Sequence, residues 1–246
     1  MDRMLYVAMS GAKETLLAQA ANNHNLANAS TSGFKADMAA FQAREVSGAG
    51  FASRAYATSS TTGFDSNAGA MISTGRDLDI AVQGSGFFAV QGGNGREAYT
   101  RAGNLHVDTL GQLLTATGQQ VMGEGGPISV PPNSSLLVGG DGTVSIVPIG
   151  QSAATLANVG RIKLVDPPTG QLVRGGDGLF HMKDGTDAPT STTTQLTSGV
   201  LESSNVNIAD SMVHMIELAR RFDLQVKTMK ASEDNGASSA QLLKSA

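Results

Sequence analysis

The feature that most constrains the fold of this chain is a pair of apolar stripes, one at each end of its 246 residues. In both stripes, apolar or small side chains recur at alternating spacings of four and three residues, which is typical of a helix that pairs with another helix. The N-terminal stripe comprises Leu5, Met9, Ala12, Leu16 and Leu26, interrupted by the polar residues Gln19 and Asn23. The C-terminal stripe comprises Asn205, Ile208, Met212, Met215, Ala219, Phe222, Val226 and Met229. We therefore expect the ends to form helices that pair with each other and with other copies of the chain.

Local signals mark the limits of both predicted helices. Gly33 is the expected end of the first helix, because helices often end on a glycine in the left-handed conformation. Asn207 is the expected N-cap of the second helix, and Asp210 follows it at the spacing of a capping box. Ile216 and Leu218 flank the second stripe and widen it, which predicts contact with more than one helix. For either segment taken alone, the alternative is an ordinary surface helix on a globular core.

Between the two ends, the composition changes twice. Residues 35–75 are dense in Ser, Thr, Ala and Gly without a clear period, so we expect an extended linker with no core of its own. From 76 to 202, short apolar runs such as LDIAV, GFFAV and TVSIV alternate with turn signals, which is the pattern of many short strands. The prediction is an α+β chain. It has a discontinuous coiled-coil domain of residues 1–34 and 203–246, the linker, and a central antiparallel β domain that is a sandwich or a barrel.

The composition argues against several classes of function. The net charge is −4 and no basic run is present, so nucleic-acid binding is not expected. The absence of Cys excludes disulfides and thiol nucleophiles. No apolar run is long enough to cross a bilayer, and the N-terminus lacks the pattern of a cleavable signal peptide.

No pattern of residues predicts catalysis, a cofactor or a metal. The segment 84–89 (GSGFFA) nominally matches a dinucleotide-binding fingerprint, but a second strand follows where a helix is required, so we expect a hairpin. The GGDG sequences at 139–142 and 175–178 are expected to be turns, because calcium-binding repeats need closely spaced tandem copies. The histidines are scattered. His214 and Glu217, one helical turn apart, are expected to be a solvated pair.

The segment ANNHNLANASTSGFKAD at 21–37 crowds amides before a Gly-Phe-Lys sequence. It resembles a signature of the axial proteins of the bacterial flagellum, which are the rod, hook and hook-associated proteins. The residues that agree in register are Asn25, Ala27, Asn28, Thr31, Gly33, Phe34 and Lys35, while His24 stands where the first Asn is usual. Three further stretches, at 74–90, 99–123 and 201–229, resemble the same family in the same order.

Two more stretches bear on which member of the family the chain resembles. The opening MDRMLYVAMSGA and the later ARRFDLQVKTMK are similar to the proximal-rod subunit that adjoins the distal rod. The distal-rod subunit is the alternative, but it more often has Tyr-Glu where this chain has Phe222-Asp223.

The resemblance implies a structural subunit of the basal-body rod, without catalytic activity or cofactor. In that family, the terminal helices form a coiled-coil inner layer around the export channel, the β domain forms an outer layer, and the linker fills the space between. The implied partners are copies of this chain, other proximal- and distal-rod proteins, and the flagellar type III export apparatus. The implied location is the periplasmic rod, reached without a cleavable signal, where the subunit transmits torque.

The expected assembly interface combines the helical stripes with the amide-rich signature. It comprises Leu5, Met9, Ala12, Leu16, Asn22, Asn25, Leu26, Asn28, Gly33, Phe34, Met212, Met215, Ala219, Phe222 and Val226. Asn22, Asn25 and Asn28 are expected to make helix-to-helix hydrogen bonds or to cap the helix end, because buried amides require partners. The competing hypothesis is a secreted, adhesin-like binding module with stable helical ends.

Overall fold

The computed structural model describes residues 2–45, 55–152 and 155–244. The chain divides into two compact units, each assembled from separate stretches of sequence. The helical unit contains residues 1–27, 37–62 and 207–246, and the β unit contains residues 28–36 and 63–206.

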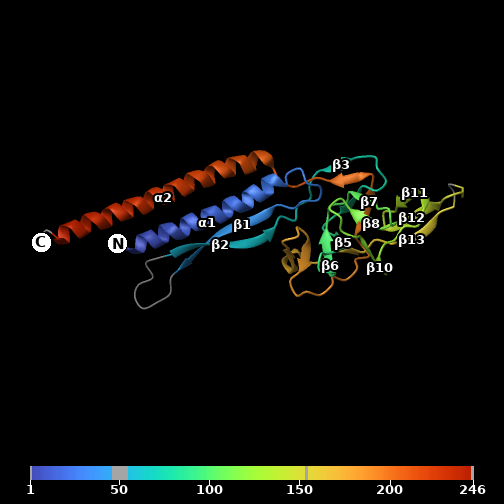
Figure 1. Ribbon diagram of the computed structural model, residues 1–246, viewed down its shortest axis with the longest axis horizontal. Helices are drawn as coiled ribbons and strands as arrows, with labels where there is room; N and C mark the ends of the chain where they lie inside the picture. The colour runs from blue at the N-terminus through green and yellow to red at the C-terminus, as the bar shows by residue number, and fades with distance from the viewer. Residues whose placement is uncertain (1, 46–54, 153–154, 245–246) are drawn as a thin grey trace. The chain divides into compact units, whose positions relative to one another are not determined.

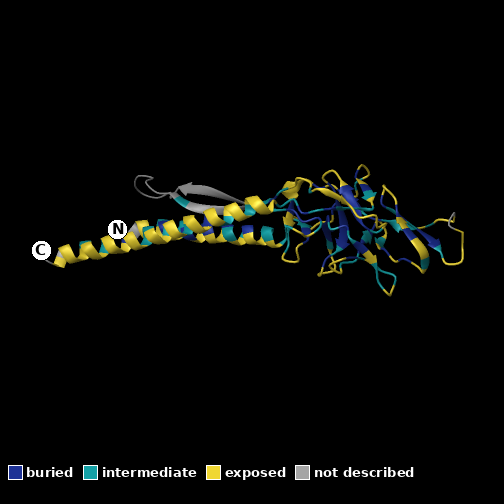
Figure 2. Cartoon of the chain, turned by 90° about the horizontal axis from the view of Figure 1, so that it is seen from above, coloured by how far each residue is buried: buried dark blue, intermediate teal, exposed yellow. Residues whose placement is uncertain are grey.

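The helical unit is built on two helices, α1 (Asp2–Ala27) and α2 (Ile208–Lys244), which lie side by side and run in opposite directions (Figure 1). At about 1.5 Å per residue they are roughly 39 Å and 55 Å long, so α2 continues past the first turn of α1 (Figures 1 and 2). The expected N-cap is confirmed, because the Asn207 Oδ1 accepts a hydrogen bond of 3.0 Å from the backbone N–H of Ala209.

A strand pair completes the helical unit. Strands β1 (Asp37–Glu45) and β2 (Ala55–Phe64) pair with each other, and β1 contacts α1. The range 35–75, expected to be an extended linker, thus contains two long strands and the short strand β3 (Met71–Ser73). The Thr and aromatic residues of β2 favour this extended conformation.

The β unit is organised around a five-stranded antiparallel sheet. Its strand order is β14 (Leu164–Val165), β5 (Phe87–Gln91), β6 (Glu97–Thr100), β16 (Phe180–Met182) and β15 (Leu172–Arg174). Successive side chains of β5 point to opposite faces, and both faces are buried. Phe88 and Val90 belong to one core, and Phe87 and Ala89 belong to a second core. Because the sheet ends at β14 and β15, it is open and not a closed barrel.

Smaller sheets cover the first core. The three-stranded sheet contains β11 (Asn133–Val138), β12 (Thr143–Pro148) and β13 (Ala157–Arg161). The two-stranded pairs are β4 (Ile80–Gln83) with β17 (Gln195–Ser198), β7 (Leu105–Val107) with β8 (Leu113–Thr115), β9 (Met122–Gly123) with β10 (Gly126–Pro127), and β3 with β18 (Val200–Glu202). A short 3-10 helix, η1, spans Thr169–Gln171. With the two terminal helices packed together, these antiparallel sheets confirm the predicted α+β class.

Three local expectations can be compared with these elements. The hairpin expected at 84–86 is wrong, because β4 pairs with β17 whereas β5 pairs with β6 and β14. The turns expected at 139–142 and 175–178 are confirmed, since they join β11 to β12 and β15 to β16. The first helix was expected to end at Gly33, but it ends earlier, at Ala27. Asn205, the first residue of the predicted C-terminal stripe, lies before the start of α2.

Candidate assembly surface

Small and polar residues form the buried face of α1. These residues are Ala8, Ala12, Thr15, Ala18 and Asn22. On α2 the more buried positions are Ser211, Met215, Leu218, Phe222, Gln225, Met229 and Ser232, which keep the alternating four- and three-residue spacing. Where the helices meet, a Cβ on Gly11 would lie 2.9 Å from the Gln225 Nε2. Gly11 therefore leaves room for the Gln225 side chain, and the helices pack closely.

Most of the large residues of the predicted stripes remain exposed in the single chain. Met9, Leu16 and Met212 are 52%, 50% and 54% exposed. Leu5, Ala219 and Val226 are also exposed, whereas Leu26, Met215 and Phe222 are half-buried. On α2 the buried face keeps Met215, Phe222 and Met229 of the predicted stripe. The predicted positions between them are each replaced by the residue before, so that Leu218 is buried in place of Ala219 and Gln225 is half-buried in place of Val226. The prediction gave weight to large apolar residues, but the intrachain contact is made largely by small ones.

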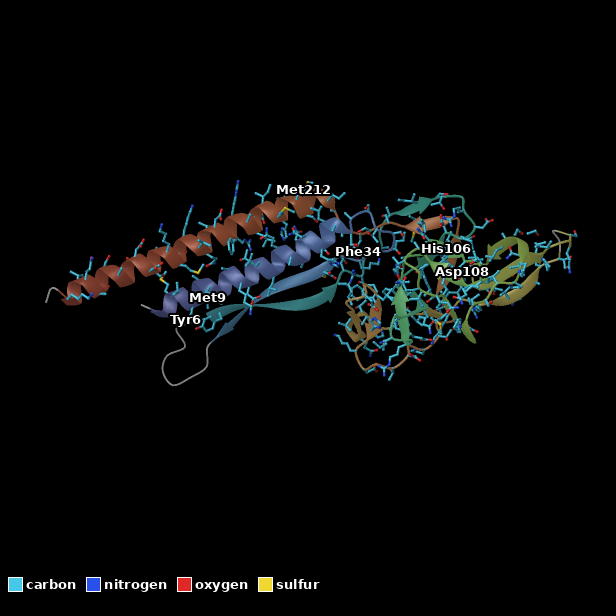
Figure 3. The ribbon with its side chains drawn as sticks, in the orientation of Figure 1. Tyr6, Met9, Phe34, His106, Asp108 and Met212 are labelled. Atoms are coloured by element: carbon cyan, nitrogen blue, oxygen red, sulfur yellow. The ribbon has the colours of Figure 1, made fainter. Side chains whose placement is uncertain are left out.

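Exposed apolar side chains thus remain along both helices, and we call this set the outer apolar residues. On α1 they are Met4, Leu5, Tyr6, Met9, Leu16 and Leu17, and on α2 they are Ile208, Met212, Val213, Ile216, Leu224, Val226 and Leu242. Figure 3 shows Tyr6 and Met9 near the start of α1 and Met212 near the start of α2. Because the helices are antiparallel, these labelled residues lie at opposite ends of the pair. Large groups of exposed apolar residues mark sites of protein–protein contact.

The amides expected at the interface have different partners. The Asn22 Nδ2 donates a hydrogen bond of 2.8 Å to the Ser211 carbonyl in α2, which confirms a helix-to-helix bond at this residue. Asn25 instead pairs with the backbone of Asp37, since its Nδ2 donates to the carbonyl at 2.9 Å and its Oδ1 accepts from the N–H at 2.8 Å. The His24 Nδ1 lies 2.7 Å from the Asp37 Oδ2. Together these contacts fix the start of β1 against the last turns of α1.

The Gly-Phe-Lys part of the signature lies inside the β unit, and the residues before it form the turn after α1. In that turn the Asn28 Oδ1 accepts a hydrogen bond of 3.2 Å from Thr31. Gly33 and Phe34 are buried. Gly33 has a φ of +69°, and a Cβ there would lie 2.2 Å from the backbone of Arg101, so only glycine fits. The Arg174 guanidinium stacks over the Phe34 ring at 4.4 Å from its centroid.

Lys35 completes the signature and is fully buried. Its Nζ donates hydrogen bonds of 2.7 Å to the Glu202 Oε1 and to the Asn67 carbonyl. Burial, together with the nearby Arg101 guanidinium, lowers the pKa of Lys35. The sequence did not reveal this environment, because lysine is normally exposed and Glu202 is 167 positions away along the chain.

The Arg101 guanidinium binds the backbone of the glycine-rich segment 84–86. Its Nε donates to the Gly86 carbonyl at 2.9 Å, and its guanidinium also donates to the Gly84 carbonyl. A Cβ on Gly86 would lie 2.5 Å from the Thr194 side chain, and Gly84 has a φ of +81°. The glycines therefore allow a sharp connection between two sheets that wraps around a buried guanidinium.

The described residues form no metal centre. They contain no group of three or more His, Asp or Glu side chains placed to hold a metal ion. His214 and Glu217 are 3.6 Å apart and both largely exposed, which confirms a solvated pair. Among the described helices, none has an apolar stretch long enough to span a membrane.

A cavity of about 340 Å³ lies between residues 107–111 and 129–133 of the β unit. Asp108 is one of the residues that line the cavity. Figure 3 labels Asp108 together with His106 on β7. The Asp108 Oδ1 accepts hydrogen bonds from the backbone N–H groups of Leu110 and Gln112, so this carboxylate shapes the turn after β7.

Comparison with known proteins agrees with a helical assembly subunit. Residues 81–146 match the model of the flagellar hook protein FlgE/F/G D1 domain, and residues 197–242 match that of the flagellar basal body rod FlgEFG protein C-terminal region. The chain is 43% identical to the flagellar basal-body rod protein FlgF of Escherichia coli (strain K12), over 99% of both chains. The chain belongs to the FlgF family of flagellar basal-body rod proteins.

Other relatives are also flagellar basal-body rod proteins. The FlgF of Caulobacter vibrioides is 32% identical over 99% of this chain and 98% of its own. The rod protein FlgG of Bacillus subtilis (strain 168) is also 32% identical, over 95% of this chain and 96% of its own. The expectation of a structural rod subunit that is not an enzyme is thereby confirmed, and the hypothesis of a secreted binding module is not retained.

Proposed function

We propose that this FlgF-family subunit is built into the basal-body rod through its outer apolar residues. In this arrangement α1 and α2 form the inner layer around the export channel, and the β unit forms the outer layer. The observation that carries the proposal is the exposure of Met9, Leu16 and Met212 although the helices are already paired through smaller residues. Burying each large apolar side chain at a contact contributes about 1.5–3 kcal/mol.

The partners in this proposal are copies of the chain and neighbouring proteins of the proximal and distal rod. The subunit lies in the proximal rod next to the distal rod, on the periplasmic side, and transmits torque. It leaves the cell through the flagellar type III export apparatus, without cleavage of a signal. The support is the family membership.

The test replaces one outer apolar residue with a charged one. Met9→Asp should leave the free chain folded, because Met9 is half exposed, but it places a carboxylate in each subunit contact. We expect cells that carry only Met9→Asp to lose motility and to yield purified basal bodies without this subunit. Export of the variant into the medium should continue.

The matched control is Lys13→Asp, which introduces the same residue at an exposed position of the same helix. It controls for the lower helix propensity of Asp. Motile cells with Met9→Asp present in the rod at the normal level would contradict the proposal.

A further inference from the structure

The β unit contains a buried charge cluster. The side chains of Lys35 and Glu202 are 0% exposed and that of Arg101 is 1% exposed. The Glu202 carboxylate lies between the two cations, with Oε1 accepting from the Lys35 Nζ at 2.7 Å and Oε2 accepting from an Arg101 Nη at 2.8 Å. One buried carboxylate therefore lies between two buried cations, and the half-buried Asp65 carboxylate adds a weaker attraction on Lys35.

The cluster joins segments that are far apart in the sequence. Lys35 lies in the connection that leaves α1, Arg101 follows β6, and Glu202 is the last residue of β18, just before the connection to α2. The backbone N–H of Gly33 donates to the Glu202 carbonyl at 2.8 Å, and that of Gly69 donates to its side chain at 2.9 Å.

Asn205 extends the same junction beyond Glu202. Its Oδ1 accepts a hydrogen bond of 2.7 Å from the backbone N–H of Ala36, and its Nδ2 donates to the carbonyls of Asp65 and Asn67. The chain that enters the β unit and the chain that leaves it are thus fastened together at one place.

We propose that Lys35, Arg101 and Glu202 form a clasp that lets the β unit close only after its C-terminal connection has arrived beside its N-terminal one. A chain made from its N-terminus contains Lys35 and Arg101 well before Glu202. Closing the core around these cations without the carboxylate would bury uncompensated positive charge, which is strongly unfavourable.

Late closure of the β unit would matter for export only if the chain is exported as proposed above. In a chain that threads through a channel from its N-terminus, the clasp keeps the β unit open until nearly all of its strands have followed. Closure of the β unit is a property of the free chain. It can therefore be measured independently of rod assembly.

The test uses the purified full-length chain and compares Glu202→Gln with Glu97→Gln. Glu97 accepts two hydrogen bonds, of 2.7 and 2.8 Å, from Lys163 in the same unit, but this pair balances its charges and joins neither connection. Urea unfolding, with hydrogen exchange of the β5 and β6 amides, reports the folding equilibrium of the β unit. We expect Glu202→Gln to lower that equilibrium constant by at least about 100-fold, and Glu97→Gln by about 10-fold or less.

Two further variants separate charge from packing. Lys35→Met leaves Arg101 and Glu202 as a balanced pair, so its effect should be smaller than that of Glu202→Gln. The double variant Lys35→Met/Glu202→Gln removes one of the two uncompensated cations. It should therefore be more stable than Glu202→Gln alone.

Two results would overturn the clasp: an effect of Glu202→Gln no larger than that of Glu97→Gln, or a double variant that is less stable than Glu202→Gln. If Glu202→Gln leaves no folded β unit, the double variant decides. If the double variant recovers protected β5 and β6 amides, the clasp is supported. If the double variant has no protected amides although Lys35→Met alone folds, the clasp is contradicted.

Discussion

The two units of this chain bury their apolar residues in opposite ways. In the β unit, strand β5 places phenylalanines on both faces of a sheet, and each face is covered by a core made from the same chain. In the helical unit, α1 buries Ala8 and Ala12 while Met9 and Leu16 stay exposed. Because hydrophobic stabilisation scales with the apolar area removed from water, the β unit holds its stabilising contacts within itself. The helical unit leaves large apolar side chains exposed, and in the proposed rod they would be buried against other subunits.

The largest effect that tests this comparison is expected in the β unit. Phe88 is completely buried in its first core, so Phe88→Ala should lower the free energy of unfolding by about 3–5 kcal/mol. Urea unfolding of the full chain measures this loss. Leu110→Ala is the control, since Leu110 is 77% exposed in the same unit and its truncation should cost less than about 0.5 kcal/mol. A loss below about 1 kcal/mol for Phe88→Ala would contradict the conclusion that the β unit is stabilised by apolar contacts within itself.

The second effect is a loss of stability at alkaline pH that also belongs to the β unit. Burial raises the pKa of Tyr99 to about 12, and its hydroxyl oxygen accepts a hydrogen bond of 2.6 Å from the Ala188 N–H. Since the folded state holds the proton more tightly than the unfolded state, this contribution is present below about pH 10 and is lost toward about pH 12. We expect a loss of roughly 2–3 kcal/mol over that window.

Unfolding by urea at a series of pH values measures the alkaline loss, and Tyr99→Phe should remove it. Lys35 acts in the opposite sense, because its lowered pKa makes stability rise with pH until its ordinary value of about 10.4 is passed. The wild type and Tyr99→Phe share this lysine, so the difference between their pH profiles isolates the tyrosine. Parallel profiles would contradict the assignment.

A smaller effect is expected at the contact between the helices. Asn22→Ala removes the hydrogen bond to the Ser211 carbonyl and should destabilise the helix pair by about 1 kcal/mol. Hydrogen exchange of the α1 and α2 amides measures this change without interference from the β unit. Asn23→Ala is the matched control, because Asn23 is exposed on the same helix and alanine is the better helix former. Equal exchange in the two variants would show that the bond does not stabilise the pair.

The smallest effect in the free chain should come from an outer apolar residue. Met212→Ala should change the free energy of unfolding by less than about 0.5 kcal/mol, because Met212 is exposed. The same variant should reduce the amount of subunit in purified basal bodies, which sharpens the contrast between contacts within and between chains. A loss above about 1 kcal/mol in the free chain would mean that Met212 already has an intrachain role.

Local sequence signals predicted the elements of the β unit well, because glycine and aspartate turns divide its strands. The same signals could not give strand pairing at residues 84–86. A glycine-rich turn shows where β4 ends, but its partner β17 lies far along the chain, with Gln83 opposite Gln195. A hairpin between β4 and β5 would have paired neighbouring strands. Instead β4 pairs with the distant strand β17.

The helical ends and their N-cap were also predictable, but the face that each helix buries was not. The four- and three-residue spacing holds for more than one face of α2, and large apolar residues drew the prediction to Met212 and Val226. In the chain, Leu218 and Gln225 on the neighbouring face lie nearer to α1, whose small residues accommodate them. The environment of Lys35 escaped prediction for a different reason, since a buried ion pair depends on partners that no local pattern contains.

The packing of Gln225 over Gly11 also links the evolutionary histories of two distant positions. A Cβ at position 11 would push aside the end of the flexible Gln225 side chain, so a larger residue there requires either another Gln225 rotamer or a shorter residue at 225. Where the residue at position 11 becomes larger, a shorter residue at 225 should therefore often accompany it, although the two positions lie in different helices.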